Sequence, residues 1–432
     1  MVPNETTIAL PASGRRALVV RLLGEGGQGA VYEVVTEDGE HLALKWYHPH
    51  TASPQQRATI ADLVDRGGPN ERFLWPMEMA TRPGAIGFGY VMPLRPPQYV
   101  GLAALLQGAI DAPLRVVCTI GVQLADSYLR LHAQGLCYRD ISFGNVFFDP
   151  ATGDTLICDN DNVGLEGDAS AVIGTMRFMA PEIVRREARP SMDSDRYSLA
   201  VLLFYLLMIG HPLLGVRELE HPLWDSRAEA RLFGEDPVFI FDPWNTSNAP
   251  APGLHDSVVQ NWDVYPTSLQ AMFIHAFTTG LRDPRNGRVM ESQWRGELVR
   301  CRDLLRPCGR CGASNFFDRT RPHRPCWSCG WLLPPPLTLC FDHNVVVLNE
   351  DTKLTAHHVG VAQYDFTTVY AQISRHTQVP GAWGLTNVGP STWSAAFPDG
   401  AIRPVEPGRT VGLIPGLRVN FGSAVGRIDD QL

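Results

Sequence analysis

Apolar and polar positions alternate with a period of two near the start of the chain and change to a helical spacing farther on. The alternating segments, which predict strands, are residues 17–23, 30–35 and 41–47. Apolar residues at helical spacing follow at 116–132 and 194–209 and predict two buried helices. This order predicts a small sheet followed by a helix-rich lobe.

Breaks in the pattern divide the chain into zones. Residues 1–14 are predicted to be a flexible N-terminus, and residues 15–305 form the first folded zone, with lobes at about 15–95 and 96–305. Residues 306–336 hold two CxxC pairs and end in three consecutive prolines, which favour a stiff spacer. This middle zone is predicted to be a compact module followed by a linker.

The last zone, residues 337–432, consists of short apolar stretches interrupted by turn sequences such as FPDG and EPGR. Turn signals at intervals of roughly ten residues are typical of a β-sandwich. The chain is therefore predicted to be a multidomain α+β protein with an all-β C-terminal sandwich.

Composition limits the classes of function. The chain has 432 residues, of which 44% are hydrophobic and 19% charged, which excludes a fully disordered or fibrous protein. The formal net charge of −8 argues against sequence-independent binding to nucleic acid or to an anionic membrane. The most apolar run, 199–209, is shorter than the roughly 20 residues that span a bilayer, and the N-terminus lacks a secretory signal. We expect a cytoplasmic protein without nucleic-acid or membrane partners.

A glycine-rich turn lies between the first two predicted strands, at Gly24, Gly26 and Gly29. Glycines allow backbone N–H groups to approach phosphate oxygens, although a flexible hairpin fits the same pattern. Lys45 follows in an apolar strand, where its ammonium is costly unless it meets an anion. The alternative for Lys45 is a strand-end lysine in solvent.

Three polar residues near two later apolar strands supply oxygen atoms. Asp140 and Asn145 lie five residues apart, and Asp159 follows another apolar strand. Such groups are suited to Mg²⁺, with one carboxylate left for a substrate hydroxyl. Isolated polar loop residues are the alternative.

In this order, the motifs resemble a eukaryotic-type protein kinase over about residues 15–305. The resemblance implies a bilobal kinase fold, ATP and Mg²⁺ (or Mn²⁺) as cofactors, and a protein substrate. It implies that Asp140 orients the substrate hydroxyl and that Asn145 and Asp159 bind magnesium. The residues that it places around the nucleotide are Gly24, Gly26, Gly29, Val31, Ala43, Lys45, Met92, Asn145 and Asp159.

The resemblance also implies supporting and regulatory residues. Asp195 corresponds to a buried aspartate of the central helix, and Arg288 is expected to pair with Glu182. Arg139 precedes the catalytic aspartate, where an arginine can neutralise a phosphorylated loop residue. The regulatory candidates are Arg139, Ser170 as a phosphosite, and Thr175 as a contact of Asp140. An unmodified loop is the alternative.

The sequence departs from the kinase pattern at several positions. Ser142 stands where serine/threonine kinases have a lysine, and loss of that charge could slow phosphoryl transfer. The helix expected at 54–66 has no glutamate for Lys45, so Asp62 is the best substitute, with Asp65 behind it. The leading hypothesis is an active serine/threonine kinase that phosphorylates itself or a partner. The alternative is a pseudokinase scaffold that binds nucleotide and assembles partners without phosphoryl transfer.

The middle zone carries a metal-ligand pattern. Cys308, Cys311, Cys326 and Cys329 form two CxxC pairs, each followed by glycine, and resemble a four-cysteine zinc ribbon. Four thiolates close the coordination shell of Zn²⁺, which makes the metal structural. Four free buried thiols are the alternative. The basic stretch around residues 319–324 fits nucleic-acid contact less well than a spacer or docking knuckle.

The C-terminal zone resembles a forkhead-associated domain in four pieces, at residues 373–376, 382–388, 398–400 and 415–422. The phosphate-binding Gly-Arg of such domains is replaced by His357-His358, which favours a protein-binding scaffold over a phosphopeptide reader.

The combination of the three parts resembles bacterial kinases of stress or tellurite-resistance triads. The resemblance implies a metal-dependent phosphatase and a von Willebrand factor A-type protein as partners.

Overall fold

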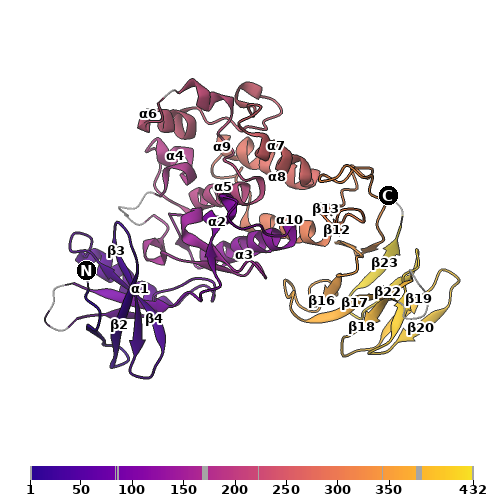
Figure 1. Ribbon diagram of the computed structural model, residues 1–432, viewed down its shortest axis with the longest axis horizontal. Helices are drawn as coiled ribbons and strands as arrows, with labels where there is room; N and C mark the ends of the chain where they lie inside the picture. Colours follow the sequence, from indigo (N-terminus) through magenta and orange to yellow (C-terminus); the bar gives the residue numbers. More distant parts are fainter. Residues whose placement is uncertain are drawn as a thin grey trace. The chain divides into compact units, whose positions relative to one another are not determined.

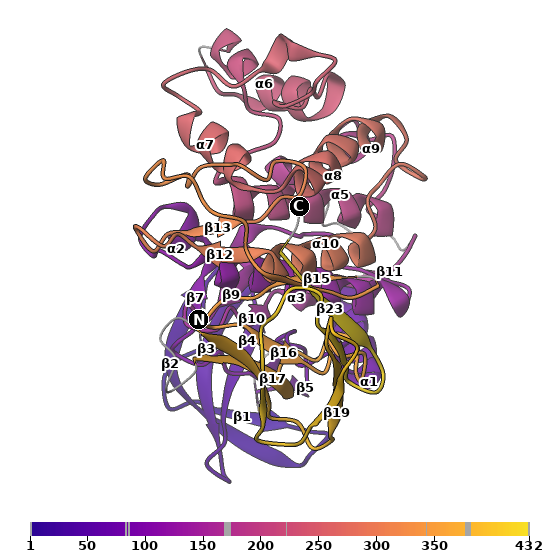
Figure 2. The ribbon, with the colours of Figure 1, turned by 90° about the vertical axis from the view of Figure 1, so that its right-hand side faces the viewer.

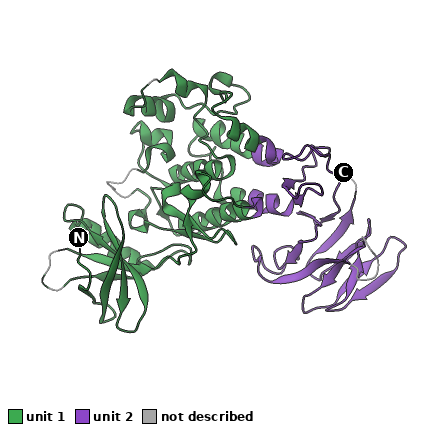
Figure 3. Cartoon of the chain, viewed as in Figure 1, with its two compact units in different colours: residues 1–112, 116–262, 271–296 green, residues 113–115, 263–270, 297–432 purple. Residues whose placement is uncertain are grey.

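The computed structural model describes residues 2–82, 84, 87–167, 174–221, 223–342, 344–375 and 382–430. Figure 1 shows the course of the chain with its helices and strands labelled. The chain divides into two compact units, coloured green and purple in Figure 3. They comprise residues 1–112, 116–262 and 271–296, and residues 113–115, 263–270 and 297–432. Within the described residues, no helix is long and apolar enough to cross a membrane.

A six-stranded antiparallel sheet begins the first unit, with the order β1-β2-β3-β4-β6-β5. Figure 1 labels its strands β2, β3 and β4. The bounds are Thr7–Leu10 (β1), Arg15–Glu25 (β2), Gly29–Thr36 (β3), His41–Tyr47 (β4), Glu78–Ala80 (β5) and Gly89–Pro93 (β6). Alternate side chains of these strands form one apolar core, which includes Val19, Tyr32, Val34 and Leu44. The three predicted strands are β2, β3 and β4, which confirms the alternating pattern.

The prediction that residues 1–14 are flexible is wrong, because β1 pairs with β2 at the edge of this sheet. Ile8 and Leu10 are fully buried in the sheet core. The backbone N–H of Val2 donates a hydrogen bond to the Tyr32 hydroxyl at 2.8 Å. Two apolar side chains at a period of two are enough to bind a short edge strand to an existing core.

Helix α1, Pro54–Arg66, follows β4 and has a well-defined start. The Ser53 side chain accepts a hydrogen bond from the Gln56 backbone N–H, and Pro54 occupies the first turn. The helix buries Ile60 and Leu63, and it ends at Gly67, whose φ of 73° favours glycine. These signals are local, so the sequence determines where the helix begins and ends.

The rest of the first unit is mainly helical. The two helices predicted from apolar spacing are α3, Leu114–Ala133, and α5, Met192–Met208. The other helices of the chain are α2 (Leu102–Leu106), α4 (Pro181–Val184), α6 (Ser226–Ala230), α7 (Asp256–Val264), α8 (Thr267–Phe277), α9 (Thr279–Arg282) and α10 (Glu291–Asp303). Strand β7 (Val100–Gly101) precedes α2. Four further short strands lie between α3 and α4: β8 (Leu136–Cys137), β9 (Val146–Phe148), β10 (Thr155–Ile157) and β11 (Gly164–Leu165).

Two buried contacts support these loops as the sequence predicted. Asp195 of α5 accepts hydrogen bonds from the backbone N–H groups of Tyr138 and Arg139, at 2.6 and 2.9 Å. Arg288 donates to both carboxylate oxygens of Glu182 at 2.9 Å. The Asp195 contact ties the residues just before Asp140 to the central helix.

His132 of α3 extends this support into the core. Its two ring nitrogens lie 3.1 Å from Asp195 Oδ2 and 2.6 Å from Glu291 Oε1. Burial disfavours the charged imidazole, but the hydrogen bonds to the two carboxylates outweigh it and raise the pKa of His132 to about 9. His132 is therefore a buried cation at neutral pH.

The raised pKa predicts a loss of stability at alkaline pH. An unfolded histidine titrates near 6.5, so the contribution of His132 is complete below that pH and is lost as pH rises through about 9. The full loss corresponds to about 3 kcal/mol. We expect the melting temperature of the protein to fall between pH 7 and 9.5, and to fall less in a His132→Gln variant. Parallel pH profiles for the two proteins would contradict this assignment.

The second unit contains the cysteine module and the C-terminal sheets. Strands β12, Leu305–Pro307, and β13, Ser314–Phe316, form a two-stranded antiparallel sheet. A six-stranded sheet follows, in the order β15-β14-β23-β22-β19-β20, together with a four-stranded sheet, β16-β17-β18-β21. Figure 2 labels β15, β16, β17, β19 and β23 of these two sheets. Their bounds are Thr338–Cys340 (β14), Val345–Val347 (β15), Lys353–Thr355 (β16), Val369–Arg375 (β17), Trp383–Asn387 (β18), Trp393–Ala396 (β19), Ile402–Val405 (β20), Thr410–Gly412 (β21), Arg418–Asn420 (β22) and Val425–Asp429 (β23).

The two C-terminal sheets share one apolar core. Leu339, Trp393 and Val419 come from the six-stranded sheet, and Leu354 and Leu385 from the four-stranded sheet. All five side chains are almost completely buried. Side chains from two inner sheet faces that meet in this way make a sandwich core, so the all-β prediction is confirmed.

Candidate active site

The glycine-rich turn joins β2 to β3, and its glycines have two different roles. At Gly29 a Cβ would lie 2.3 Å from the carbonyl oxygen of Trp46, so only glycine fits between β3 and β4. At Gly24 and Gly26 a Cβ would meet no atom within 4 Å. The turn is closed by a hydrogen bond from Gly26 N–H to the Gly29 carbonyl at 2.9 Å. Gly29 is required by strand packing, whereas Gly24 and Gly26 leave one side of the turn open to a ligand.

Lys45 lies on β4 and is buried, with 5% of its side chain exposed. Its Nζ lies 2.8 Å from Asp161 Oδ2, 3.3 Å from Asp159 Oδ1 and 3.2 Å from Gln28 Oε1. Burial alone would lower the pKa of Lys45, but the two carboxylates raise it above the ordinary value. Lys45 is thus a buried cation that faces the loop after β10, and the solvated alternative is excluded.

Val31, Ala43 and Met92 lie on neighbouring strands of the same sheet. Val31 is opposite Lys45 in the β3–β4 register, and Ala43 is opposite Met92 in the β4–β6 register. Ala43 and Met92 are buried. The sheet therefore brings the expected nucleotide-binding residues of β3, β4 and β6 together around the strand that carries Lys45.

Asp140 and Asn145 belong to the loop between β8 and β9. The Asn145 side-chain amide donates to the Asp140 carbonyl oxygen at 2.9 Å. Thr175 donates its hydroxyl to Asp140 Oδ1 at 2.8 Å, which is the predicted contact. Burial raises the pKa of Asp140, although the hydrogen bonds from Thr175 and Asn145 oppose the shift. A carboxylate held in this way accepts hydrogen bonds and is fixed in orientation.

Asp159 is brought next to Asn145 by the pairing of β9 with β10. Val146 is opposite Ile157 in this register, and the Cys158 backbone N–H donates to the Asn145 carbonyl at 3.0 Å. Asp159 has φ 53° and ψ 44°, a left-handed conformation that is uncommon outside glycine. Its side chain is 47% exposed. The strand pair thus places an amide and an accessible carboxylate side by side, a donor set suited to a hard divalent cation.

Asn160 follows Asp159 and is fixed by its side-chain amide. This amide donates to the carbonyl oxygens of Leu74 and Ile157 at 2.9 and 3.1 Å, and Asn160 is 1% exposed. The polar side chain therefore anchors the one-turn 3₁₀ helix at Asn160–Asn162 to the backbone of its neighbours.

The predicted partner of Lys45 on α1 is wrong. Asp62 bonds to Arg66 on its own helix at 2.6 Å and has 56% of its side chain exposed. The face of α1 that is buried carries Ile60 and Leu63, and a carboxylate two residues from Ile60 points elsewhere on a helix. Asp65 is exposed. Lys45 pairs instead with Asp159 and Asp161.

Sequence reasoning missed Asp161, Tyr47 and Gln56 as site residues. Asp161 Oδ2 accepts a hydrogen bond from the Tyr47 hydroxyl at 2.5 Å, and Gln56 Nε2 donates to Tyr47 Oη and to the Asp161 carbonyl oxygen, both at 3.2 Å. The available signal was a second carboxylate, Asp161, two residues after Asp159 and close to the end of an apolar strand, because a carboxylate that is buried there needs a cation.

Arg139 lies beside Asp140 and contacts backbone rather than a carboxylate. Its guanidinium donates to the carbonyl oxygens of Asn162 and Leu165 at 3.4 and 3.0 Å. Arg139 therefore holds the strand β11 that follows the 3₁₀ turn. Ser170, the predicted phosphosite, lies outside the described residues.

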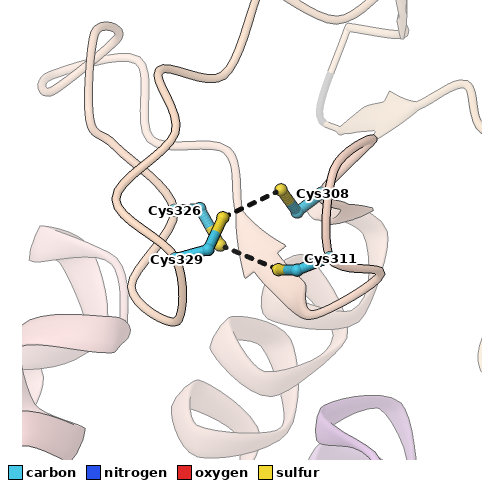
Figure 4. Close-up of side chains that lie close together, drawn as sticks. All are labelled: Cys308, Cys311, Cys326 and Cys329. Carbon is cyan, nitrogen blue, oxygen red and sulfur yellow. Dashed lines mark hydrogen bonds between the residues drawn. The ribbon is translucent and has the colours of Figure 1, made fainter.

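The four cysteines of the middle zone come together (Figure 4). Their sulfur atoms all lie within 4.8 Å of one another. Cys308 Sγ lies 3.7 Å from Cys329 Sγ, and Cys311 Sγ lies 3.7 Å from Cys326 Sγ. A tetrahedron with Zn–S bonds of about 2.3 Å has edges of about 3.8 Å, so these distances fit zinc.

The two CxxCG turns share one conformation. The N–H groups of Gly312 and Gly330 donate to the carbonyl oxygens of Cys308 and Cys326, each at 2.9 Å. Both glycines have positive φ, 77° and 70°. Burial opposes ionisation of Cys326, but backbone N–H groups of its turn lower the pKa of its thiol to about 6. The turns thus direct two pairs of sulfur atoms at one point, and the thiolate is favoured at Cys326.

Comparison with known proteins finds similarity to protein kinases in part of the chain. The family model of the protein kinase domain matches residues 100–248, a segment that contains Asp140, Asn145 and Asp159 but neither the glycine turn nor Lys45. The chain is 26% identical over 252 residues to protein kinase MCK1 of Saccharomyces cerevisiae, covering 56% of this chain and 66% of the relative. It is 27% identical over 209 residues to serine/threonine-protein kinase Pkn1 of Myxococcus xanthus, covering 44% of this chain and 28% of the relative.

A third relative gives the same result over a shorter stretch. CBL-interacting protein kinase 4 of Oryza sativa subsp. japonica is 31% identical over 128 residues, covering 26% of this chain and 28% of the relative. The chain thus spans less than two thirds of the length of each of these relatives. The matched segment and the relatives show that the chain is similar to protein kinases, among them a bacterial serine/threonine-protein kinase.

Proposed function

We propose that the chain transfers the γ-phosphate of ATP, with Mg²⁺ or Mn²⁺, to a serine or threonine hydroxyl of itself or of a partner protein. The observation that carries the proposal is the contact of Lys45 Nζ with Asp159 Oδ1 at 3.3 Å, between segments more than a hundred residues apart, next to the paired strands that bring Asn145 to the same loop. Lys45 holds the α- and β-phosphates, and Asn145 and Asp159 hold the divalent cation. Gly24, Gly26 and Gly29 form the turn over the phosphates.

Asp140 acts on the hydroxyl that receives the phosphoryl group. The hydroxyl oxygen forms a bond to the γ-phosphorus, the bond from that phosphorus to the β–γ bridging oxygen breaks, and ADP leaves. The proton of the hydroxyl passes to Asp140. The hydrogen bonds from the Thr175 hydroxyl to Oδ1, at 2.8 Å, and from the Asn145 amide to Oδ2, at 3.5 Å, orient the carboxylate for this step.

The test is incubation of the purified protein with ATP labelled in the γ-phosphate and Mg²⁺. We expect covalent label on serine or threonine of the chain or of an added protein substrate. The site contains a lysine paired with an accessible aspartate and a second carboxylate held in orientation by Thr175. Magnesium-dependent nucleotide binding without any transfer would reject the proposal in favour of a pseudokinase scaffold. Absence of nucleotide binding would reject both the kinase and the nucleotide-binding pseudokinase.

The cysteine module is proposed to hold one structural Zn²⁺ through Cys308, Cys311, Cys326 and Cys329. The closed shell of four thiolates leaves no open coordination position, so this metal takes no part in the transfer. Its role is to fold the stretch between the kinase part and the sandwich.

The C-terminal sandwich is proposed to be a forkhead-associated-like scaffold that binds protein without reading phosphate. His358 is buried, with Nδ1 2.9 Å from Thr355 N and Nε2 3.0 Å from Asp303 Oδ1, so its ring nitrogens are engaged inside the unit. This burial supports a scaffold role. His376, in one of the matching pieces, lies outside the described residues.

We further propose a place in a cytoplasmic bacterial stress-signalling module, with a metal-dependent phosphatase and a von Willebrand factor A-type protein as partners. The support is the resemblance of the combined kinase, zinc ribbon and sandwich sequence to kinases of such triads. No nucleic acid and no membrane is expected to take part.

A further inference from the structure

The catalytic lysine of this site has its carboxylate partners on one loop. In the described residues, Lys45 meets Asp159 and Asp161, which are two residues apart. Helix α1 supplies neither of them, since its Asp62 is exposed and bonds to Arg66. A buried ammonium is stable only with an anion beside it, so without nucleotide at least one of the two aspartates must pair with Lys45.

The surroundings of the two aspartates differ. The side chain of Asp161 is 0% exposed, whereas that of Asp159 is 47% exposed. Lys45 is closer to Asp161, at 2.8 Å, than to Asp159, at 3.3 Å. An enclosed carboxylate has no room for a hydrated cation, while an accessible one has. Of the two carboxylates, only Asp159 is therefore accessible to a hydrated cation.

Asp161 is itself held by β4 and α1. Oδ1 accepts a hydrogen bond from Lys45 at 2.9 Å, and Oδ2 accepts one from the Tyr47 hydroxyl at 2.5 Å. Lys45 and Tyr47 are two residues apart on β4 and so share a face of the sheet. Gln56 of α1 donates to Tyr47 Oη and to the Asp161 carbonyl oxygen. Both carboxylate oxygens are therefore satisfied, as a buried carboxylate requires.

We propose that Asp161 is the positioning residue of Lys45, in the place of a carboxylate from α1, and that it leaves Asp159 free for the divalent cation. This inference rests on the proposed kinase function. The lysine that holds the phosphates and the aspartate that holds the cation are then placed by the same turn, residues 159–161. The alignment of the two no longer depends on an ion pair to a mobile helix, which is a point where kinases are commonly regulated.

Acylation of lysine side chains probes Lys45 directly, because Lys45 and Lys353 are the only lysines of the sequence. Lys353 is exposed and serves as an internal reference for acylation by acetic anhydride, read by mass spectrometry of the full chain. In the native protein Lys45 should react far more slowly than Lys353, because two carboxylates hold it. The Asp161→Asn variant should raise the Lys45 rate relative to Lys353 by about tenfold, the loss expected for one charged hydrogen bond.

A compensating variant separates positioning from general stability. Gln56 is the residue of α1 that already touches Asp161 and Tyr47, so Gln56→Glu with Asp161→Asn offers Lys45 a carboxylate from the helix. We expect this pair of changes to restore slow labelling of Lys45. The matched control Asp62→Asn should leave labelling unchanged, since Asp62 faces solvent.

Kinetics supply the second readout. Asp161→Asn should lower kcat/KM for ATP by about 100-fold, with a higher KM, because a displacement of about 1 Å at a reacting site has that cost. Gln56→Glu should recover part of the loss. A role in folding alone would lower the amount of active protein and leave KM for ATP unchanged, and that result would overturn the proposal.

Lysine labelling keeps the two proposals distinguishable. A native protein that transfers no phosphate would reject the kinase function, while the Lys45 rate would still report its partner. Unchanged labelling in Asp161→Asn, or faster labelling in Asp62→Asn, overturns the role of Asp161. If Asp161→Asn does not fold, Tyr47→Phe removes one of its hydrogen bonds, and a labelling rate equal to that of the native protein would overturn the proposal.

Discussion

Replacement of Asp140 by asparagine is expected to remove phosphoryl transfer and to preserve nucleotide binding. Asparagine keeps the size of the side chain but cannot take the proton of the attacking hydroxyl, a contribution of about 10²- to 10⁴-fold. Asp140 makes no contact with Lys45 among the recorded bonds of the described chain, so the phosphate and cation groups are left in place. The measurement is the rate of label transfer from γ-labelled ATP, beside a titration of the variant with ATP and Mg²⁺.

A matched control removes a carboxylate elsewhere on the same lobe. Asp111 is exposed, and its change to asparagine should leave both transfer and binding as they are. Transfer by Asp140→Asn at the native rate would show that the reaction does not use this carboxylate. Loss of nucleotide binding in the same variant would show that Asp140 belongs to the binding set, contrary to its assigned role.

Removal of the metal from the four-cysteine module is expected to unfold that module. Structural zinc contributes roughly 10–16 kcal/mol to the folding of small zinc modules, because the ligands are not preorganised in the unfolded chain. The two-stranded sheet of β12 and β13 is too small to fold by hydrophobic burial alone. We expect one zinc ion per chain by elemental analysis, and chelation should expose residues 306–336 to proteolysis.

Single cysteine variants test the ligand set. Cys308→Ser should abolish stoichiometric zinc, whereas Cys340→Ser should retain it, since Cys340 lies on β14 outside the cluster. Labelled phosphate transfer should persist after chelation if the zinc is structural, because no cysteine of the cluster belongs to the first unit. A metal-free protein with the same proteolysis pattern, or zinc retained by Cys308→Ser, would contradict the four-thiolate assignment.

Local signals account for most of what could be predicted. The strands β2, β3 and β4 follow from alternation over a few residues, and α1 follows from its Ser53 cap and Pro54. The CxxCG turns are set by hydrogen bonds within five residues, so their geometry follows from their spacing. The edge strand at Thr7–Leu10 was missed because two apolar residues gain stability only from the core that they join.

The amino-acid sequence by itself determined the order of the glycine-rich turn, Lys45, Asp140 and Asp159, together with the four-cysteine cluster. These depend on residue type and short spacing, which local backbone chemistry translates into structure. Only the tertiary structure decided which carboxylate holds Lys45. That choice depends on the contacts of Asp161 with Lys45 and Tyr47, which lie more than a hundred residues away in the sequence, and on the exposed position of Asp62 on α1.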